Sequence, residues 1–129
     1  MKFTDVFGQW DGVRLLSKTV VTLAADGEQT IYTVSNGKSA ILVYAILVAG
    51  ANANSTDFTI GQDGAETDWV GTYQCDNLNA ANDAILIMPV PNATPVIGKV
   101  YGAGTLIKFT VANHAGGATN TLYLFGYLF

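Results

Sequence analysis

Charged side chains are scarce in this sequence. They make up 12% of its 129 residues, about half of the roughly 25% that is usual in soluble domains. The net charge is −4, and the basic residues are scattered along the chain at Lys2, Arg14, Lys18, Lys38, Lys99 and Lys108. No basic stripe exists to neutralise phosphates, so we expect no nucleic-acid partner. A surface with so little charge suits a protein that packs against other proteins, although extracellular β-domains can look the same.

Cysteine and histidine occur once each, as Cys75 and His114. A single cysteine excludes a disulfide framework within the chain, and one cysteine with one histidine cannot supply the usual tetrahedral zinc site. Any Ser-His or Cys-His system must use His114, yet the sequence has no G-x-S-x-G elbow and no phosphate-binding G-x-x-x-x-G-K-[ST] loop. We therefore expect no catalytic residues, no metal, no cofactor and no enzymatic activity.

Long hydrophobic segments are also lacking. The apolar run Ala40–Ala49 has ten residues, about half of the roughly 20 that span a bilayer as a helix. The first residues, Met1–Val6, lack the apolar region of a secretory signal. We expect no membrane partner, and a chain that is either made and left in the cytoplasm or already processed.

The run Ser39–Gly50 is the most informative stretch that the sequence does contain. Ile, Val and Tyr favour a pleated chain, and the flanks Asn36–Lys38 and Gly50–Asn52 are rich in turn formers, which predicts a long central strand. Its alternating faces are both apolar, namely Ile41, Val43, Ala45, Leu47 and Leu42, Tyr44, Ile46, Val48. Both faces must therefore be covered.

The rest of the chain consists of short β-rich runs separated by clusters of Gly, Asn and Asp, which is the pattern of an all-β domain. Strands are predicted at about Lys18–Ala24, Gln29–Val34, Ser39–Ala49, Thr56–Ile60, Ala84–Met88, Val96–Tyr101, Thr105–Ala112 and Thr121–Phe129. Asp26-Gly27 and Asn36-Gly37 are predicted hairpin turns. About eight strands over residues 17–129 favour a single antiparallel two-sheet sandwich of the jelly-roll type, with a continuous barrel as the alternative. The three prolines Pro89, Pro91 and Pro95 indicate a loop or an edge crossing.

Residues 1–16 form a distinct N-terminal arm or short helical lead-in. The aromatic residues Phe3, Phe7 and Trp10 fall near helical spacing, but Gly8 and Gly12 weaken an isolated helix. Two interpretations remain open. The arm folds back over its own domain, or it lays these aromatics on a neighbouring subunit, where aromatic anchors are favoured.

The last strand repeats the apolar pattern of the central one. Leucines and Gly126 alternate with four aromatics, Tyr123, Phe125, Tyr127 and Phe129. Because a sandwich offers one inside face per sheet, a second doubly apolar strand favours contacts between subunits. We therefore name these aromatics and Tyr44 as candidate interface residues of a dimer or trimer, although a core role for them stays open.

The segment Thr56–Asp83 concentrates six of the ten acidic residues and has no Lys or Arg. We interpret it as an acid-rich surface loop. Asp63, Asp68, Trp69 and Tyr73 are candidate ligand-binding residues, because aromatic rings stack on sugars and carboxylates bond their hydroxyls. Calcium is a second possibility, but Gln62–Trp69 does not match the EF-hand loop pattern.

Several of these features occur together in one kind of protein. An arm with Phe3, Phe7 and Trp10, a low-charge Gly/Asn/Thr-rich β-sandwich and an aromatic last strand resemble small virion proteins of tailed bacteriophages. Capsid decoration (cement) proteins and minor head or tail fibre proteins are the nearest types. The resemblance implies a non-enzymatic structural virion protein that oligomerises and binds other virion proteins on a capsid or tail. The alternative is a carbohydrate-binding β-sandwich module for cell-surface attachment.

Overall fold

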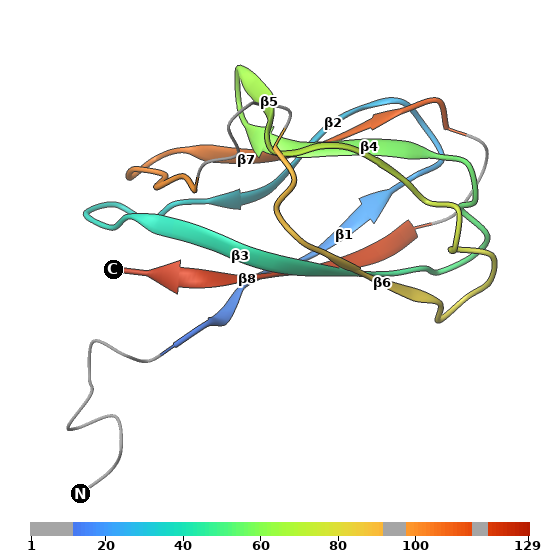
Figure 1. Ribbon diagram of the computed structural model, residues 1–129, viewed down its shortest axis with the longest axis horizontal. Coiled ribbons are helices and arrows are strands. Elements are labelled where there is room, and N and C mark those ends of the chain that lie inside the picture. The colour runs from blue at the N-terminus through green and yellow to red at the C-terminus, as the bar shows by residue number, and fades with distance from the viewer. Residues whose placement is uncertain (1–11, 92–97, 115–118) are drawn as a thin grey trace, which may run out of the picture.

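The computed structural model describes residues 12–91, 98–114 and 119–129, and these parts contain eight strands and no helix (Figure 1). The strands are β1 (Arg14–Thr22), β2 (Gly27–Thr33), β3 (Ala40–Val48), β4 (Asp57–Gln62), β5 (Ala65–Gln74), β6 (Ala84–Ile87), β7 (Leu106–Ala112) and β8 (Thr119–Leu128). They form two antiparallel four-stranded sheets, in the orders β1-β8-β3-β6 and β2-β7-β4-β5. The predicted all-β sandwich is confirmed.

The strand pairing is nested from the chain ends inward. β1 pairs with β8, β2 with β7, β3 with β6 and β4 with β5. A long antiparallel ribbon that folds over on itself in this way places its successive pairs alternately in two sheets. This is the jelly-roll form of the sandwich.

The hairpins predicted at Asp26-Gly27 and Asn36-Gly37 are wrong. Asp26-Gly27 and Asn36-Gly37 do turn the chain, and Gly37 has a φ of 71° that favours glycine. However, β1 and β3 belong to one sheet and β2 to the other, so each turn carries the chain between sheets. The tight hairpin lies instead at Asp63-Gly64, between the paired residues Gln62 and Ala65.

The predicted central strand is confirmed, but the alternation of its side chains between the two faces is interrupted once. β3 lies between β8 and β6, and its register shifts between Leu42 and Tyr44. This bulge places Val43 out of the alternation, because an extra residue in one strand reverses the faces beyond it. The buried face is therefore Ala40, Leu42, Ala45 and Leu47, and the outer face is Ile41, Tyr44, Ile46 and Val48.

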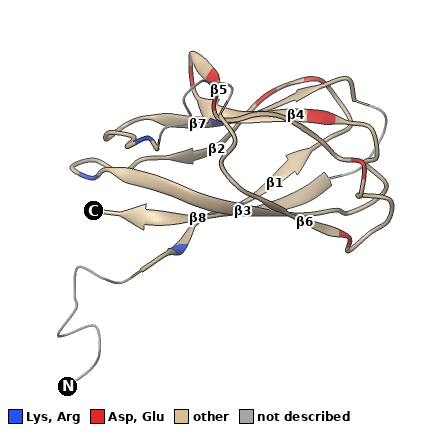
Figure 2. Cartoon of the chain, viewed as in Figure 1, with Lys and Arg blue, Asp and Glu red and all other residues tan. Residues whose placement is uncertain are grey.

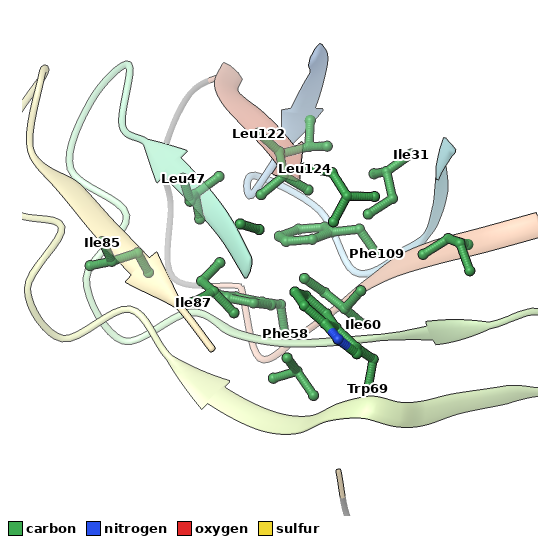
Figure 3. Close-up of a cluster of buried hydrophobic side chains, with 14 of the residues drawn as sticks. Ile31, Leu47, Phe58, Ile60, Trp69, Ile85, Ile87, Phe109, Leu122 and Leu124 are labelled. Atoms are coloured by element: carbon green, nitrogen blue, oxygen red, sulfur yellow. The ribbon is translucent and has the colours of Figure 1, made fainter. Parts of the chain in front are cut away.

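The core fills the space between the two sheets (Figure 3). Sheet β1-β8-β3-β6 contributes aliphatic side chains such as Leu47, Leu122 and Leu124. The facing sheet contributes aromatic rings, and Phe58 stacks on Phe109 with ring centroids 4.7 Å apart. Each strand of a sandwich has one inside face, so the second apolar faces of β3 and β8 lie outside this core.

Two predicted boundaries change. β1 begins at Arg14, so residues 14–16 of the predicted arm belong to the sandwich; residues 1–11, with Phe3, Phe7 and Trp10, lie outside the described residues. The predicted strand Val96–Tyr101 is wrong for residues 98–100, because only Tyr101 forms a single bridge, with Ala40. Among the described residues no helix is long and apolar enough to cross a membrane.

Candidate functional site

The predicted acid-rich loop is in large part sheet. Residues 57–62 and 65–74 form the β4–β5 hairpin, and β5 was absent from the predicted strands. Trp69 of β5 is 4% exposed, and its indole N–H donates to the carbonyl oxygen of Leu42 across the sandwich, at 3.2 Å. Tyr73 is half-buried and stacks on Phe58, with ring centroids 5.3 Å apart. The expectation that Trp69 offers a sugar-stacking surface is therefore wrong, because its ring belongs to the core.

Asp68 is the centre of a small polar cluster. Its Oδ1 accepts hydrogen bonds from the Gln62 backbone N–H, at 3.1 Å, and from the hydroxyl of Tyr101, at 2.8 Å. Its Oδ2 lies 2.6 Å from the Lys99 ammonium nitrogen. Burial, followed by the hydrogen bond to Asp68, raises the pKa of Tyr101 well above its usual value, so this phenol stays protonated and donates. The cluster therefore ties segment 98–101 to β5.

A pocket of about 110 Å³ lies beside this cluster. Its lining is mostly apolar and comprises Ile41, Leu42, Asp68, Trp69, Pro89, Pro91, Gly98 and Lys99. The backbone of Val90 bonds to β5 through the Trp69 carbonyl and the Gly71 N–H, both at 2.8 Å. Pro89 and Pro91 flank this bridge and lack the N–H groups that would extend it. The pocket is small compared with the 300–1,000 Å³ or so of typical ligand sites.

Three carboxylates converge at the turn of the β4–β5 hairpin. The oxygens of Glu28, Asp63 and Glu66 lie within 4.8 Å of one another. The pKa of Glu66 is lowered because its own backbone N–H and that of Gly64 donate to its carboxylate. Oxygen ligands of this kind are those that calcium takes. Asp63 was a predicted ligand residue; Glu28 was missed, because only the sheet order β2-β7-β4 brings it near.

The single cysteine is buried, and the single histidine pairs with an aspartate. Cys75 is fully buried, and burial raises the pKa of its thiol to about 12, so the nucleophilic thiolate is nearly absent at neutral pH. His114 lies in the connection between β7 and β8, where its Nδ1 is 2.8 Å from Oδ1 of Asp26. The Asp26 carboxylate also accepts the backbone N–H of His114, at 3.0 Å. This pair fastens the β7–β8 connection to the β1–β2 turn.

The predicted interface aromatics that the structure describes gather on one surface. Cross-strand partners share a face, so the register aligns Leu15 with Phe125 and Tyr44, and Lys18 with Tyr123, Ile46 and Leu86. We call this surface of the β1-β8-β3-β6 sheet the outer apolar face. It consists of Leu15, Lys18, Val20, Ile41, Tyr44, Ile46, Val48, Ala84, Leu86, Thr121, Tyr123, Phe125 and Tyr127.

The outer apolar face has an aromatic centre and a single charged side chain. Tyr44 stacks on Phe125, with ring centroids 4.6 Å apart and ring planes 14° apart. The charged side chain is Lys18, whose ammonium lies 5.7 Å from the centroid of the Tyr123 ring. At the margins, Val20 is 65% and Leu86 is 58% exposed, and Phe129 lies exposed just beyond Tyr127. The face therefore gathers four of the nine exposed large hydrophobic residues in the described part of the chain, namely Leu15, Val20, Leu86 and Tyr127.

Comparisons with known proteins do not assign the chain to a family. No model of a protein family, no curated protein and no solved structure matches the chain.

Proposed function

We propose that this chain is a non-enzymatic structural protein of a virion, which oligomerises and binds a capsid or tail surface. The outer apolar face is the observation that carries the proposal. Contiguous apolar surface of this kind marks a protein interaction site, because a free monomer gains nothing from exposing it to water. Its aromatic centre is typical of the residues that dominate binding at protein interfaces.

Three titratable groups of the described residues, Cys75, His114 and Asp68, support a structural role. The Cys75 thiol is buried and protonated, and His114 is held by Asp26. The Asp68 carboxylate accepts hydrogen bonds from Tyr101, Lys99 and the backbone N–H of Gln62. Each of these groups thus joins two segments of the sandwich or lies in its core.

The glycan-binding alternative receives less support. Jelly-roll domains occur both in viral capsids and in lectins, so the fold analogy alone does not decide between them. A lectin of the kind expected from the sequence requires an accessible aromatic surface beside carboxylates. The Trp69 ring is buried, and the Tyr73 ring is covered on one side by Phe58.

The first test is whether the chain is part of a particle. We expect mass spectrometry of density-gradient-purified virions, from the source of the sequence, to find peptides of this chain at many copies per particle. Virions that lack the chain would contradict the proposal.

The role of the N-terminal arm is tested by co-sedimentation of purified protein with such virions. Deletion of residues 1–11 keeps all of β1, which begins at Arg14. We expect the shortened chain to fold, by its far-UV circular dichroism, and to lose binding to the particle. Unchanged co-sedimentation would show that the arm does not make the contact.

A further inference from the structure

We propose that the outer apolar face is the contact between two copies of this chain, which pack sheet against sheet about a two-fold axis. This inference rests on the proposed function and deepens it, because it assigns the surface through which the protein self-associates. The contact would continue the sandwich, with a second layer of interdigitated side chains outside the first core.

The distribution of charge selects this face for contact between copies. Each chain carries a net charge of −4, so two copies repel each other through most of their surfaces. None of the four strands β1, β8, β3 and β6 contains an acidic residue. In the described parts the acids lie on β2, β4 and β5 and in the connections, as the red segments of Figure 2 show. The outer apolar face is the broad surface where repulsion is weakest.

The one charge on the face does not oppose this contact. Lys18 extends from the edge strand β1 with its ammonium near the ring of Tyr123. This cation–π contact offsets part of the cost of covering the charge of Lys18, whereas a lysine with no ring beside it has no such partner. No carboxylate of the face needs to be desolvated, which is the main cost of pairing charged surfaces.

The dimensions of the face suit a dimer. Strands about 4.8 Å apart that rise about 3.3 Å per residue give the three long strands and the short β6 a projected area of roughly 500 Å². Accessible area exceeds projected area on a surface of standing side chains, so the face approaches the roughly 800 Å² that each partner buries in a standard interface. A face that meets the same face of a second copy gives an isologous, closed pair and no open chain of subunits.

The test is the mass of the full chain by light scattering after size exclusion, from micromolar to millimolar concentrations. Val20→Lys and Leu86→Lys, alone and combined, place new cations on opposite margins of the face. Val90→Lys is the matched control, because Val90 is 62% exposed against 65% for Val20 but lies beside β5. All variants are first compared with the wild type by far-UV circular dichroism, since exposed positions are expected to tolerate lysine.

We expect the wild type and Val90→Lys to have twice the mass of one 13.6 kDa chain. The combined Val20→Lys/Leu86→Lys variant should be reduced to one chain over most of the range. A single-chain or three-chain mass for the wild type would overturn the proposal, as would a dimer unaffected by the combined variant. If the wild type is a monomer and only the face variants lose co-sedimentation with virions, the face binds the particle, and the particle-binding part of the proposed function stands without self-association.

Discussion

At the residue scale, Asp68 shows how a polar group is used inside an apolar fold. The hydroxyl of Tyr101 is buried, and Asp68 is the acceptor that the structure gives it, at 2.8 Å. Lys99 adds an ion pair, but 38% of its side chain is exposed, so solvent screens this contact. The hydrogen bonds from the buried phenol and from the Gln62 backbone N–H therefore carry most of the contribution of Asp68 to stability.

We predict that Asp68→Ala lowers the free energy of unfolding by about 1–3 kcal/mol, because it leaves the buried Tyr101 hydroxyl without its acceptor. In a Tyr101→Phe background the same substitution should cost less, since no hydroxyl remains to be satisfied. Urea denaturation of the two single variants and the double variant measures the difference as a double-mutant cycle. Equal costs in both backgrounds would show that the Tyr101 bond contributes nothing.

At the scale of elements, Gly126 sets the approach of β8 to β3. A Cβ at this position would meet the carbonyl oxygen of Ile41 and would lie 2.9 Å from Cδ1 of Leu16. We predict that Gly126→Ala destabilises the protein by about 1–3 kcal/mol, because backbone must shift to admit the methyl group. Gly102→Ala is the control, since a Cβ at Gly102 meets nothing within 4 Å. Urea midpoints that coincide for the two variants would refute this account.

The elements also show what the sequence could and could not predict. β7 was predictable from its apolar alternation, and β3 and β8 from their long runs of residues that favour strands. β5 was missed because its start, Ala65–Asp68, is polar and its acids favoured a loop. Asp26-Gly27 specifies a turn, but nothing local specifies whether the next strand pairs or crosses to the other sheet, since that choice depends on distant partners such as β7 and β8.

The residues of the candidate sites were also predictable only in part. Tyr44, Tyr123, Phe125 and Tyr127 were identified from their alternation, and the structure places them together on the outer apolar face. That they bind a partner remains a prediction. The contacts of Asp68 with Lys99 and Tyr101 were not predictable, because they join segments 31 and 33 residues apart that only the completed fold brings together.

At the scale of the whole molecule, the two sheets are fastened at one end by a surface pair. Asp26 lies in the β1–β2 connection and His114 in the β7–β8 connection, and both connections pass from one sheet to the other. The His114 backbone N–H, followed by the His114 ring, lowers the pKa of Asp26 below its usual 3.8. A carboxyl group whose pKa is lower in the folded state stabilises the fold above its unfolded pKa and loses this contribution as the pH falls through the folded pKa.

We therefore predict that Asp26→Asn reduces the acid sensitivity of the whole domain. Between neutral pH and values below 3.8, the wild type should lose more of its free energy of unfolding than the variant, because the introduced amide has no proton to gain. Asp76→Asn is the control, since it removes one exposed acid from the β5–β6 connection that is not part of the Asp26–His114 pair. Urea midpoints over this pH range measure the effect, which should be small because both partners are exposed. If Asp26→Asn and Asp76→Asn change the pH profile equally, the loss reflects net charge alone and the Asp26–His114 link does not fasten the sheets.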